Sequence, residues 1–501
     1  MSELKVLNSY TRQKEVFMPI TPGHVGMYVC GPTVSGESHL GHARPFITFD
    51  VVYRYLLHLG YKVRYVRNIT DAGHFEEEGR QAEDKISTKA VLEKLEPMEL
   101  VQKYTNLFHW AMNQFNNLEP SIEPTATGHI VEQIEMIKKI MEAGYAYAAN
   151  GSVYFDVKKY AETYPYGKLS GRILDEQLET TRELDGQDEK RNKQDFALWK
   201  AAPPEHIMRW ASPWGPGFPG WHIECSAMST KYLGAEFDIH GGGMDLQFPH
   251  HESEIAQSTV CNKEVPARYW LHNNMITVNG KKMGKSYNNQ IKLTEMFDGS
   301  HPLLEQAYSP MTIRFFILQT HYRSTLDFGN EALQAAEKGL KRIWEAYEHL
   351  KRMEVLREPA QDNKATDPEL DAKVNAQLSE LDEFMNDDFN TAKVLANLFE
   401  LVPVINSIKD RHLPANVLAP DTLERLQQYF ENYLENIFGL RSETQQDDGK
   451  LNGVLDLLID IRKEARTRKD YATSDKIRNQ LQELGILLKD EKDGSVGYSF
   501  L

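Results

Sequence analysis

The chain has 501 residues, of which 41% are hydrophobic, 26% charged and 10% aromatic, so disordered, collagenous and low-complexity proteins are excluded. Fifty-seven basic and 73 acidic residues give a formal net charge of −16, which argues against indiscriminate binding to nucleic acid or anionic membranes but permits a local basic surface. No apolar run reaches the roughly 18 residues of a membrane helix, and the first residues lack the apolar segment of a signal peptide. We therefore predict a cytoplasmic protein with no membrane partner.

The first predicted elements form a strand, helix, strand unit. Residues 25–30 have the pattern of a short buried strand, apolar residues recur at helical spacing over 43–59, and residues 63–70 form a second strand. Such a unit implies a right-handed crossover and a parallel sheet. Because ligands bind at the carboxyl ends of parallel strands, the predicted site includes residues 30–42 and Thr70.

The remainder of the chain changes character several times. Residues 85–144 have a helical pattern, residues 145–200 mix short strands with turns, and parallel-strand character returns at 235–240 and 269–278. Apolar stripes at spacings of three and four then indicate a helix bundle. A polar stretch, 442–450, is the predicted linker to a terminal module, in which seven basic residues oppose three acidic ones between Arg462 and Arg478.

The predicted fold class is therefore α/β. It comprises a Rossmann-like parallel-sheet catalytic domain with an inserted subdomain, an α-helical bundle and a small C-terminal module. The predicted boundaries are 1–130 for the first half of the sheet domain, 131–215 for the insertion, 216–310 for the second half, 311–441 for the bundle and 451–501 for the module.

Two clusters point to phosphate chemistry. His39 and His42 lie between a strand and a helix, where unpaired N–H groups and the helix dipole attract anions. The segment Gly280–Ser286 places several ammonium groups on a glycine-containing loop, which suits a departing pyrophosphate. Each cluster has a structural alternative, because histidines also cap helices and lysine runs are commonly solvated surfaces.

A third cluster has the side chains of a metal site. Cys30 ends a strand, Cys225 follows Gly220-Trp-His-Ile-Glu, and His250 and Glu254 are spaced to share one helical face. Two thiolates, an imidazole and a carboxylate suit zinc, although a lone cysteine is more often a buried core residue. That structural role is assigned to Cys261, which has no partner pattern around it.

Taken together, the motifs resemble those of the bacterial cysteinyl-tRNA synthetases, a family of class I aminoacyl-tRNA synthetases. The resemblance covers nearly the whole chain and rests on six motifs in the family's order. They are Tyr28-Val-Cys-Gly-Pro-Thr33, His39-Leu-Gly-His42, Gly220-Trp-His-Ile-Glu-Cys-Ser-Ala-Met228, His240-Gly-Gly-Gly243, Phe248-Pro-His-His-Glu252 and Lys282-Met-Gly-Lys-Ser286. The histidine and lysine motifs mark class I synthetases in general, whereas the metal-ligand set narrows the resemblance to cysteine.

The resemblance implies an ATP-dependent cysteine–tRNA ligase. It implies that ATP, accompanied by Mg²⁺, lies between two catalytic histidines and two catalytic lysines, which are His39, His42, Lys282 and Lys285. The glycine run of Gly241, Gly242 and Gly243 would lie beside the adenosine. One zinc ion per chain would bind the substrate thiolate through Cys30, Cys225, His250 and Glu254. Candidates for holding the backbone of the amino acid are Thr70, Trp221 and Asp245, with a packed core aromatic as the alternative for Trp221.

The implied partners are ATP, L-cysteine and tRNA(Cys), with the bundle and terminal module along the tRNA and its unpaired anticodon. We expect a monomer. The chain departs from the family at Gly284, where serine is usual, and in residues 72–84, to which we assign no role. Two alternatives stay open: a cysteine ligase that uses the same core on an amino sugar, and an inactive RNA-binding paralogue.

Overall fold

The computed structural model describes residues 3–72, 86, 89–90, 95–172, 189–204, 206–284, 287–353, 367–414, 416–468, 470–484, 486–490 and 496–500. The chain divides into two compact units, Met1–Leu440 and Arg441–Leu501, and each is treated by itself. The prediction for residues 72–84 falls almost entirely outside the described residues, which include only Ala72 of that segment.

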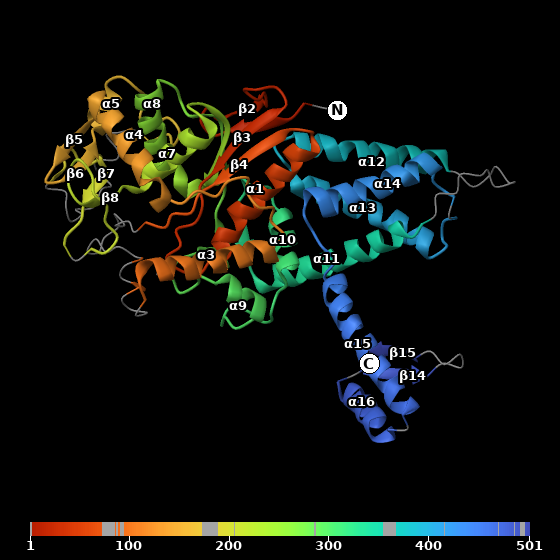
Figure 1. The fold of residues 1–501 in the computed structure, drawn as a ribbon. Coiled ribbons are helices and arrows are strands. Elements are labelled where there is room, and N and C mark those ends of the chain that lie inside the picture. The colour runs from red at the N-terminus through yellow and green to blue at the C-terminus, as the bar shows by residue number, and fades with distance from the viewer. Residues whose placement is uncertain are drawn as a thin grey trace. The chain divides into compact units, whose positions relative to one another are not determined.

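The centre of the first unit is a parallel sheet with strand order β10-β9-β3-β4 (Figure 1). Its strands are β3 (His24–Val29), β4 (Lys62–Arg67), β9 (Phe237–Gly243) and β10 (Ala267–Asn273). Helix α1 (Leu40–His58) connects β3 to β4 and buries most of its residues. The predicted strand, helix, strand unit is confirmed, and β9 pairs with β3 although about 200 residues separate them in the sequence.

Smaller elements surround this sheet. A hairpin of β1 (Lys5–Asn8) and β2 (Gln13–Val16) precedes it, and Ser9 N–H donates to Trp270 C=O of β10. The helical prediction over 85–144 holds for α3 (Pro97–Gln114) and α4 (Ile130–Glu142). Between these helices the chain instead extends along β4, where Val66 and Ile122 form a parallel bridge, because backbone pairing with a sheet edge overrides the local helical pattern.

The insertion between the two sheet halves has its own antiparallel sheet, β5-β6-β7-β8. Its apolar side chains pack with α4, α7 and α8 around a separate cluster that includes Phe155, Phe196 and Trp199. Besides α3 and α4, the described elements between β4 and β9 are η1 (Thr127–His129), β5 (Ala146–Ala149), β6 (Ser152–Phe155), α5 (Val157–Ala161), β7 (Phe196–Ala201), β8 (Gly217–Pro219) and α7 (Trp221–Leu233). Between β9 and β10 lie η3 (Met244–Leu246), η4 (Gln247–His251) and α8 (Glu252–Asn262).

A second small sheet follows β10, with strand order β12-β11-β13. It consists of β11 (Ile276–Val278), β12 (Lys281–Lys282) and β13 (Leu326–Phe328), with α9 (Leu293–Asp298) and α10 (Pro310–Leu318) between the last two strands. Arg44 of α1 is 1% exposed and donates to the carbonyls of Met275 and Tyr322, just before β11 and β13. One buried guanidinium thus connects α1 to the segments that precede two strands of this sheet.

The helices after β13 form the predicted bundle. They are α11 (Asn330–Lys351), α12 (Pro368–Asn386), α13 (Thr391–Lys409), α14 (Pro420–Glu431) and η6 (Asn432–Ile437). In the part of the chain that the structure describes, α13 is the one helix long and apolar enough to cross a membrane, and 50% of that stretch is buried within the protein. The packing is that of a core helix.

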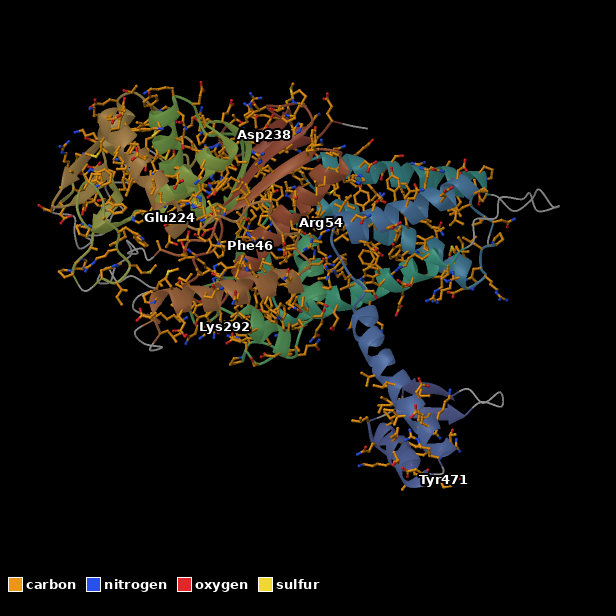
Figure 2. All side chains as sticks on the ribbon, in the orientation of Figure 1. Phe46, Arg54, Glu224, Asp238, Lys292 and Tyr471 are labelled. Atoms are coloured by element: carbon orange, nitrogen blue, oxygen red, sulfur yellow. The ribbon has the colours of Figure 1, made fainter. Side chains whose placement is uncertain are left out.

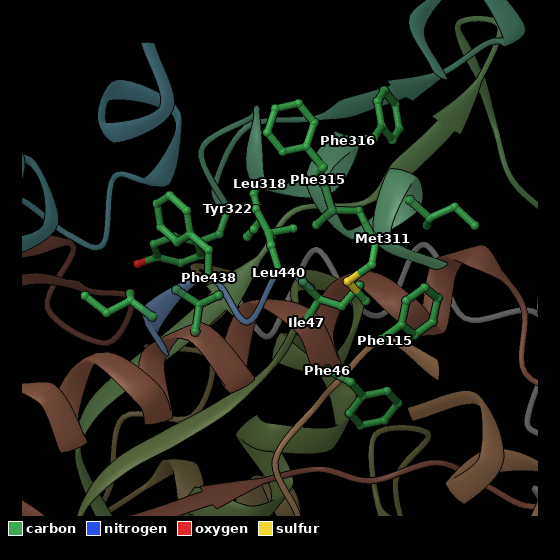
Figure 3. Close-up of a cluster of buried hydrophobic side chains, with 14 of the residues drawn as sticks. Phe46, Ile47, Phe115, Met311, Phe315, Phe316, Leu318, Tyr322, Phe438 and Leu440 are labelled. Carbon is green, nitrogen blue, oxygen red and sulfur yellow. The ribbon is translucent and has the colours of Figure 1, made fainter. Parts of the chain in front are cut away.

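One continuous apolar core joins α1, α10 and the end of the bundle. Figure 3 shows Ile47 of α1 facing Met311 of α10, with Phe438 and Leu440 beside them. A buried polar cluster reinforces this junction: Asp50 accepts hydrogen bonds from Arg54 (2.8 Å), from Arg314 of α10 and from the N–H of Leu118 (2.7 Å). Arg314 also donates to the carbonyl of Phe438 (2.6 Å). Figure 2 labels Arg54 on α1.

The second unit contains α15 (Glu443–Thr467), α16 (Tyr471–Glu483), β14 (Ile486–Asp490) and β15 (Val496–Phe500). The predicted linker 442–450 is wrong as a loop, because α15 begins at Glu443. Ser442 followed by Gln445 is a helix-start pattern that the polar composition obscured. The predicted basic surface needs a second correction, since Arg462 is 3% exposed and packs inward.

Candidate active site and metal centre

The candidate metal ligands converge at the carboxyl edge of the parallel sheet. Cys30 directly follows β3, Cys225 lies on α7, and His250 and Glu254 flank the junction between η4 and α8. Their ligand atoms all lie within 4.8 Å of one another, and all four residues are buried. Glu254 Oε1 is 3.1 Å from His250 Nε2 and 3.7 Å from Cys30 Sγ, and the two sulfurs are 3.8 Å apart.

A second, overlapping group was missed by the sequence analysis. His240 and His251 lie within 4.8 Å of Cys30 and Glu254 and are as deeply buried. His240 Nε2 is 2.9 Å from Glu254 Oε2, while His251 Nε2 is 3.3 Å from Cys30 Sγ. The adjacent pair His250-His251 was the available signal, but sequence spacing does not tell which imidazole faces the thiolates.

The electrostatics of the cluster distinguish the two histidines. Burial lowers the pKa of His250, but the Cys225 thiol and the Glu254 carboxylate raise it to about 10. Burial and the neighbouring His240 hold the pKa of His251 well below its usual range. His250 therefore faces the negative donors, whereas His251 is a neutral imidazole whose Nδ1 is 2.8 Å from His272 Nε2.

The carboxylate and one thiol are set up as anions. Burial raises the pKa of Glu254, yet His240 and His250 lower it to about 2. Burial also raises the pKa of Cys225, but hydrogen bonding with Cys30 and the charge of His250 bring it below its usual value. Burial and the Cys225 thiolate raise the pKa of Cys30. Such crowding of acidic donors in an apolar interior calls for a cation, so the donor set fits a zinc ion.

Neighbouring polar groups orient these ligands. His222 Nδ1 is 3.0 Å from His250 Nδ1, so the second nitrogen of that imidazole has a fixed partner. Asn68 Oδ1 accepts the N–H of Gly31 (2.9 Å) and lies 3.7 Å from Cys225 Sγ. Groups of this kind fix the ring orientation and basicity of metal ligands.

The candidate amino acid ligands fall at different distances from this cluster. Trp221 begins α7, is 36% exposed, and its ring centroid is 4.4 Å from that of His250, so it forms part of the rim of the cluster. Thr70 is buried, and its Oγ1 donates to Glu224 Oε2 (2.9 Å). Asp245 is exposed on η3. Figure 2 labels Glu224.

The predicted ATP ligands lie at the same edge of the sheet. His39 caps α1, and its ring stacks on that of His42 with centroids 3.7 Å apart. Gly241 and Gly242 belong to β9, where a Cβ would meet the ring of Phe49 or of His251. These glycines therefore allow close packing of the sheet on α1 and on the metal cluster.

The lysine motif starts on the small second sheet. Lys282 ends β12 and is exposed, while Lys285 and Ser286 fall outside the described residues. The segment after the loop pairs with the histidine motif, because Leu40 N–H donates to Ile291 C=O (3.0 Å) and Leu293 N–H to Ser38 C=O (2.9 Å). The fold thus joins the two motifs through backbone hydrogen bonds.

In the second unit, several members of the predicted basic cluster are exposed: Lys463, Arg466, Arg468, Lys476 and Arg478. Lys469 lies outside the described residues. Arg468 is 2.5 Å from Glu464, with both side chains largely exposed.

Three protein-family models match successive parts of the chain. Residues 16–338 match the class I (C) tRNA synthetase catalytic domain, residues 380–442 the DALR domain, and residues 449–495 the cysteinyl-tRNA ligase anticodon binding domain.

Curated relatives align with nearly the whole chain. Cysteine–tRNA ligase of Bacteroides fragilis is 58% identical over 495 residues, 98% of each chain. The ligase of Deinococcus radiodurans is 46% identical and is matched over 96% of its length by 98% of this chain.

Solved structures share the fold at low identity. Methionyl-tRNA synthetase of Mycobacterium tuberculosis with methionyl-adenylate gives a TM-score of 0.55 at 13% identity, covering 83% of this chain and 89% of that one. The LeuRS-tRNA-LeuAMS complex of Agrobacterium radiobacter gives 0.56 at 11% identity, covering 84% and 85%.

Proposed function

The chain belongs to the cysteinyl-tRNA synthetase family of class I aminoacyl-tRNA synthetases, and from this premise we propose how its site performs the ATP-dependent joining of L-cysteine to tRNA(Cys). The observation that carries the proposal is the convergence of Cys30, Cys225, His250 and Glu254 at the edge of the parallel sheet that also leads into the histidine pair.

The first step needs no enzyme nucleophile. The carboxylate of cysteine attacks the α-phosphate of ATP, which forms cysteinyl-adenylate and releases pyrophosphate. His39 and His42 stand at the N-terminus of α1, where they and the helix dipole stabilise phosphate charge. Lys282 and Lys285 supply cations to the departing pyrophosphate, and Mg²⁺ would accompany ATP.

The second step transfers the acyl group. A hydroxyl of the terminal adenosine of tRNA attacks the acyl carbonyl, and AMP leaves with the bonding electrons. The DALR domain and the anticodon binding domain support tRNA as the partner. We assign the bundle, residues 311–441, and the module, residues 451–501, to tRNA binding. The monomeric state and the cytoplasmic location stay predictions.

Discrimination against serine is the role that we propose for the metal centre. An apolar pocket separates near-isosteres by only about 10 to 200-fold, whereas translation needs about 10⁴ to 10⁵. Zinc bound by Cys30, Cys225, His250 and Glu254 would supply a soft Lewis acid that favours a thiolate over a hydroxyl. Trp221 at the rim would cover the side chain of the substrate. Thr70 and Asp245 remain our proposed contacts for the amino acid backbone.

The two alternatives are not favoured. A ligase acting on an amino sugar has no use for the anticodon binding domain matched by residues 449–495. An inactive paralogue would have lost ligands or signature residues, whereas the metal set and His39, His42, Lys282 and Lys285 are all present.

Pyrophosphate exchange into ATP, measured with each standard amino acid in turn, tests the function. We expect exchange with cysteine alone and charging of tRNA(Cys) by the same preparation. Exchange with another amino acid, or amide formation with an amino sugar in place of tRNA charging, would refute the proposal.

The metal centre is tested by substituting one cysteine at a time. Metal analysis of the wild-type chain should find about one zinc, and Cys225→Ser should lose zinc together with selectivity for cysteine over serine. Cys261→Ser is the matched control, because Cys261 contacts the carbonyl of Met136 and lies outside the cluster. A metal-free wild-type chain that still rejects serine would contradict the zinc assignment.

A further inference from the structure

One buried asparagine spans the described part of the lysine loop. The Oδ1 atom of Asn289 accepts the N–H of Gly284 (2.9 Å), and its Nδ2 donates to the C=O of Lys282 (3.0 Å). Asn289 is 7% exposed, whereas its neighbour Asn288 is exposed and has a left-handed φ of 49°. The bend at Asn288 lets the next side chain reach back five and seven residues along the chain.

These bonds restrain the most flexible residue of the motif. Glycine has the widest backbone freedom of any residue, and Gly284 stands directly before Lys285 in the sequence. Its N–H is held by Asn289, and its C=O accepts the N–H of Tyr287 (3.1 Å). Both hydrogen-bonding groups of Gly284 are thus fixed by the turn that follows it.

The same turn is anchored to the histidine motif. Ile291, two residues after Asn289, is fully buried, and its carbonyl accepts the N–H of Leu40 (3.0 Å). Leu293 N–H donates to Ser38 C=O (2.9 Å), so backbone bonds are made on both sides of His39. The route from the histidine pair to the backbone of the lysine motif therefore runs through Ile291 and Asn289.

We propose that Asn289 is a positioning residue for adenylate formation, which sets the lysine loop against the histidine pair by fixing the backbone at Lys282 and Gly284. The inference rests on the proposed role of the lysines. A misplacement of about 1 Å costs about 100-fold in rate when reacting groups must be aligned. Loss of the two amide bonds therefore acts on the rate of activation, and cysteine binding at the metal cluster is spared.

Cysteine-dependent pyrophosphate exchange of Asn289→Ala and Asn289→Asp tests the proposal. Asn289→Asp keeps the acceptor for Gly284 but sets a carboxylate oxygen against the Lys282 carbonyl, so it should be at least as slow as Asn289→Ala. We expect kcat to fall about 10- to 100-fold while the KM for cysteine stays within about twofold. Asn288→Gly, in the same turn, is the matched control and should keep wild-type exchange, because glycine adopts a left-handed φ freely.

A double-mutant cycle separates positioning from general stabilisation. If Asn289 acts through the lysine motif, the double variant Lys282→Ala/Asn289→Ala should exchange pyrophosphate at nearly the same rate as the slower of the two single variants. The inference would be overturned if the rate losses of the two single variants multiplied in the double variant. It would also be overturned if Asn289→Ala lowered only the melting temperature and left the exchange rate unchanged. If Lys282→Ala alone leaves exchange unchanged, the proposed lysine role fails; if it is slow and Asn289→Ala is not, this inference alone fails.

Discussion

Replacement of Asp50 by alanine should destabilise the first unit more than any exposed ion-pair change. Asp50 is 2% exposed, and it pairs with Arg54 and with the fully buried Arg314 while accepting the N–H of Leu118. Removal of one partner from a buried ion pair costs about 3 to 5 kcal/mol, and the orphaned N–H adds about 1 kcal/mol. We therefore expect a loss of about 4 to 6 kcal/mol in the free energy of unfolding.

The corresponding thermal shift follows from the size of the unit. About 2.1 cal/mol/K of unfolding entropy per residue over the 440 residues of Met1–Leu440 gives about 0.9 kcal/mol/K. The melting temperature of Asp50→Ala should then fall by about 4 to 7 °C, measured by calorimetry. Asp50→Asn keeps an acceptor for Leu118 and should fall by an intermediate amount.

Glu135→Ala is the control, because Glu135 pairs with Lys138 on the surface of α4, where the two side chains are 58% and 42% exposed. Exposed pairs contribute about 0 to 1 kcal/mol, so its melting temperature should change by about 1 °C or less. An Asp50→Ala variant that melts within about 1 °C of wild type would refute the reasoning that this buried carboxylate stabilises the junction of α1 with α10.

Further predictions concern the reaction. Lys285→Ala should slow adenylate formation about 100-fold or more with little change in cysteine affinity, because its charge is needed as pyrophosphate departs; a rise in KM alone would contradict this assignment. A chain that ends near Asp448 should keep cysteine-dependent pyrophosphate exchange and lose most tRNA charging, and loss of both in a folded truncation would show that the module supports the catalytic domain. His250→Ala should lose zinc and activate serine, and bound zinc with serine still rejected would count against His250 as a ligand.

Much of the first unit could be predicted from local pattern. The strand at 25–30, the helix at 43–59 and the strand at 63–70 have strong periodicity, and the structure confirms them as β3, α1 and β4. Chain connectivity then requires a parallel crossover, which places Cys30 and the histidine pair at one edge. The predicted linker at 442–450 is wrong as a loop, because a polar composition does not exclude a helix and α15 begins at Glu443.

The sequence analysis named four candidate metal ligands, Cys30, Cys225, His250 and Glu254, and the structure brings their ligand atoms within 4.8 Å of one another. Cys30 and Glu254 lie within reach of three imidazoles, those of His240, His250 and His251, whereas Cys225 is grouped with His250. Sequence spacing selected His250 but did not reveal that His251 also faces the cluster, because the irregular junction of η4 and α8, not an ideal helix, sets the direction of each ring.

The sequence by itself determined the element types, the chemistry of the donor set and the family, because periodicity and motif order are properties of the chain alone. Only the tertiary structure decided which distant groups meet. Asp50 finds Arg314, and Asn289 spans the lysine motif, because the packing of α1 on α10 and the turn at Asn288 bring these groups together. Burial increases the contribution of each contact to stability, since a buried polar group without a partner loses its hydrogen bonds to water without compensation.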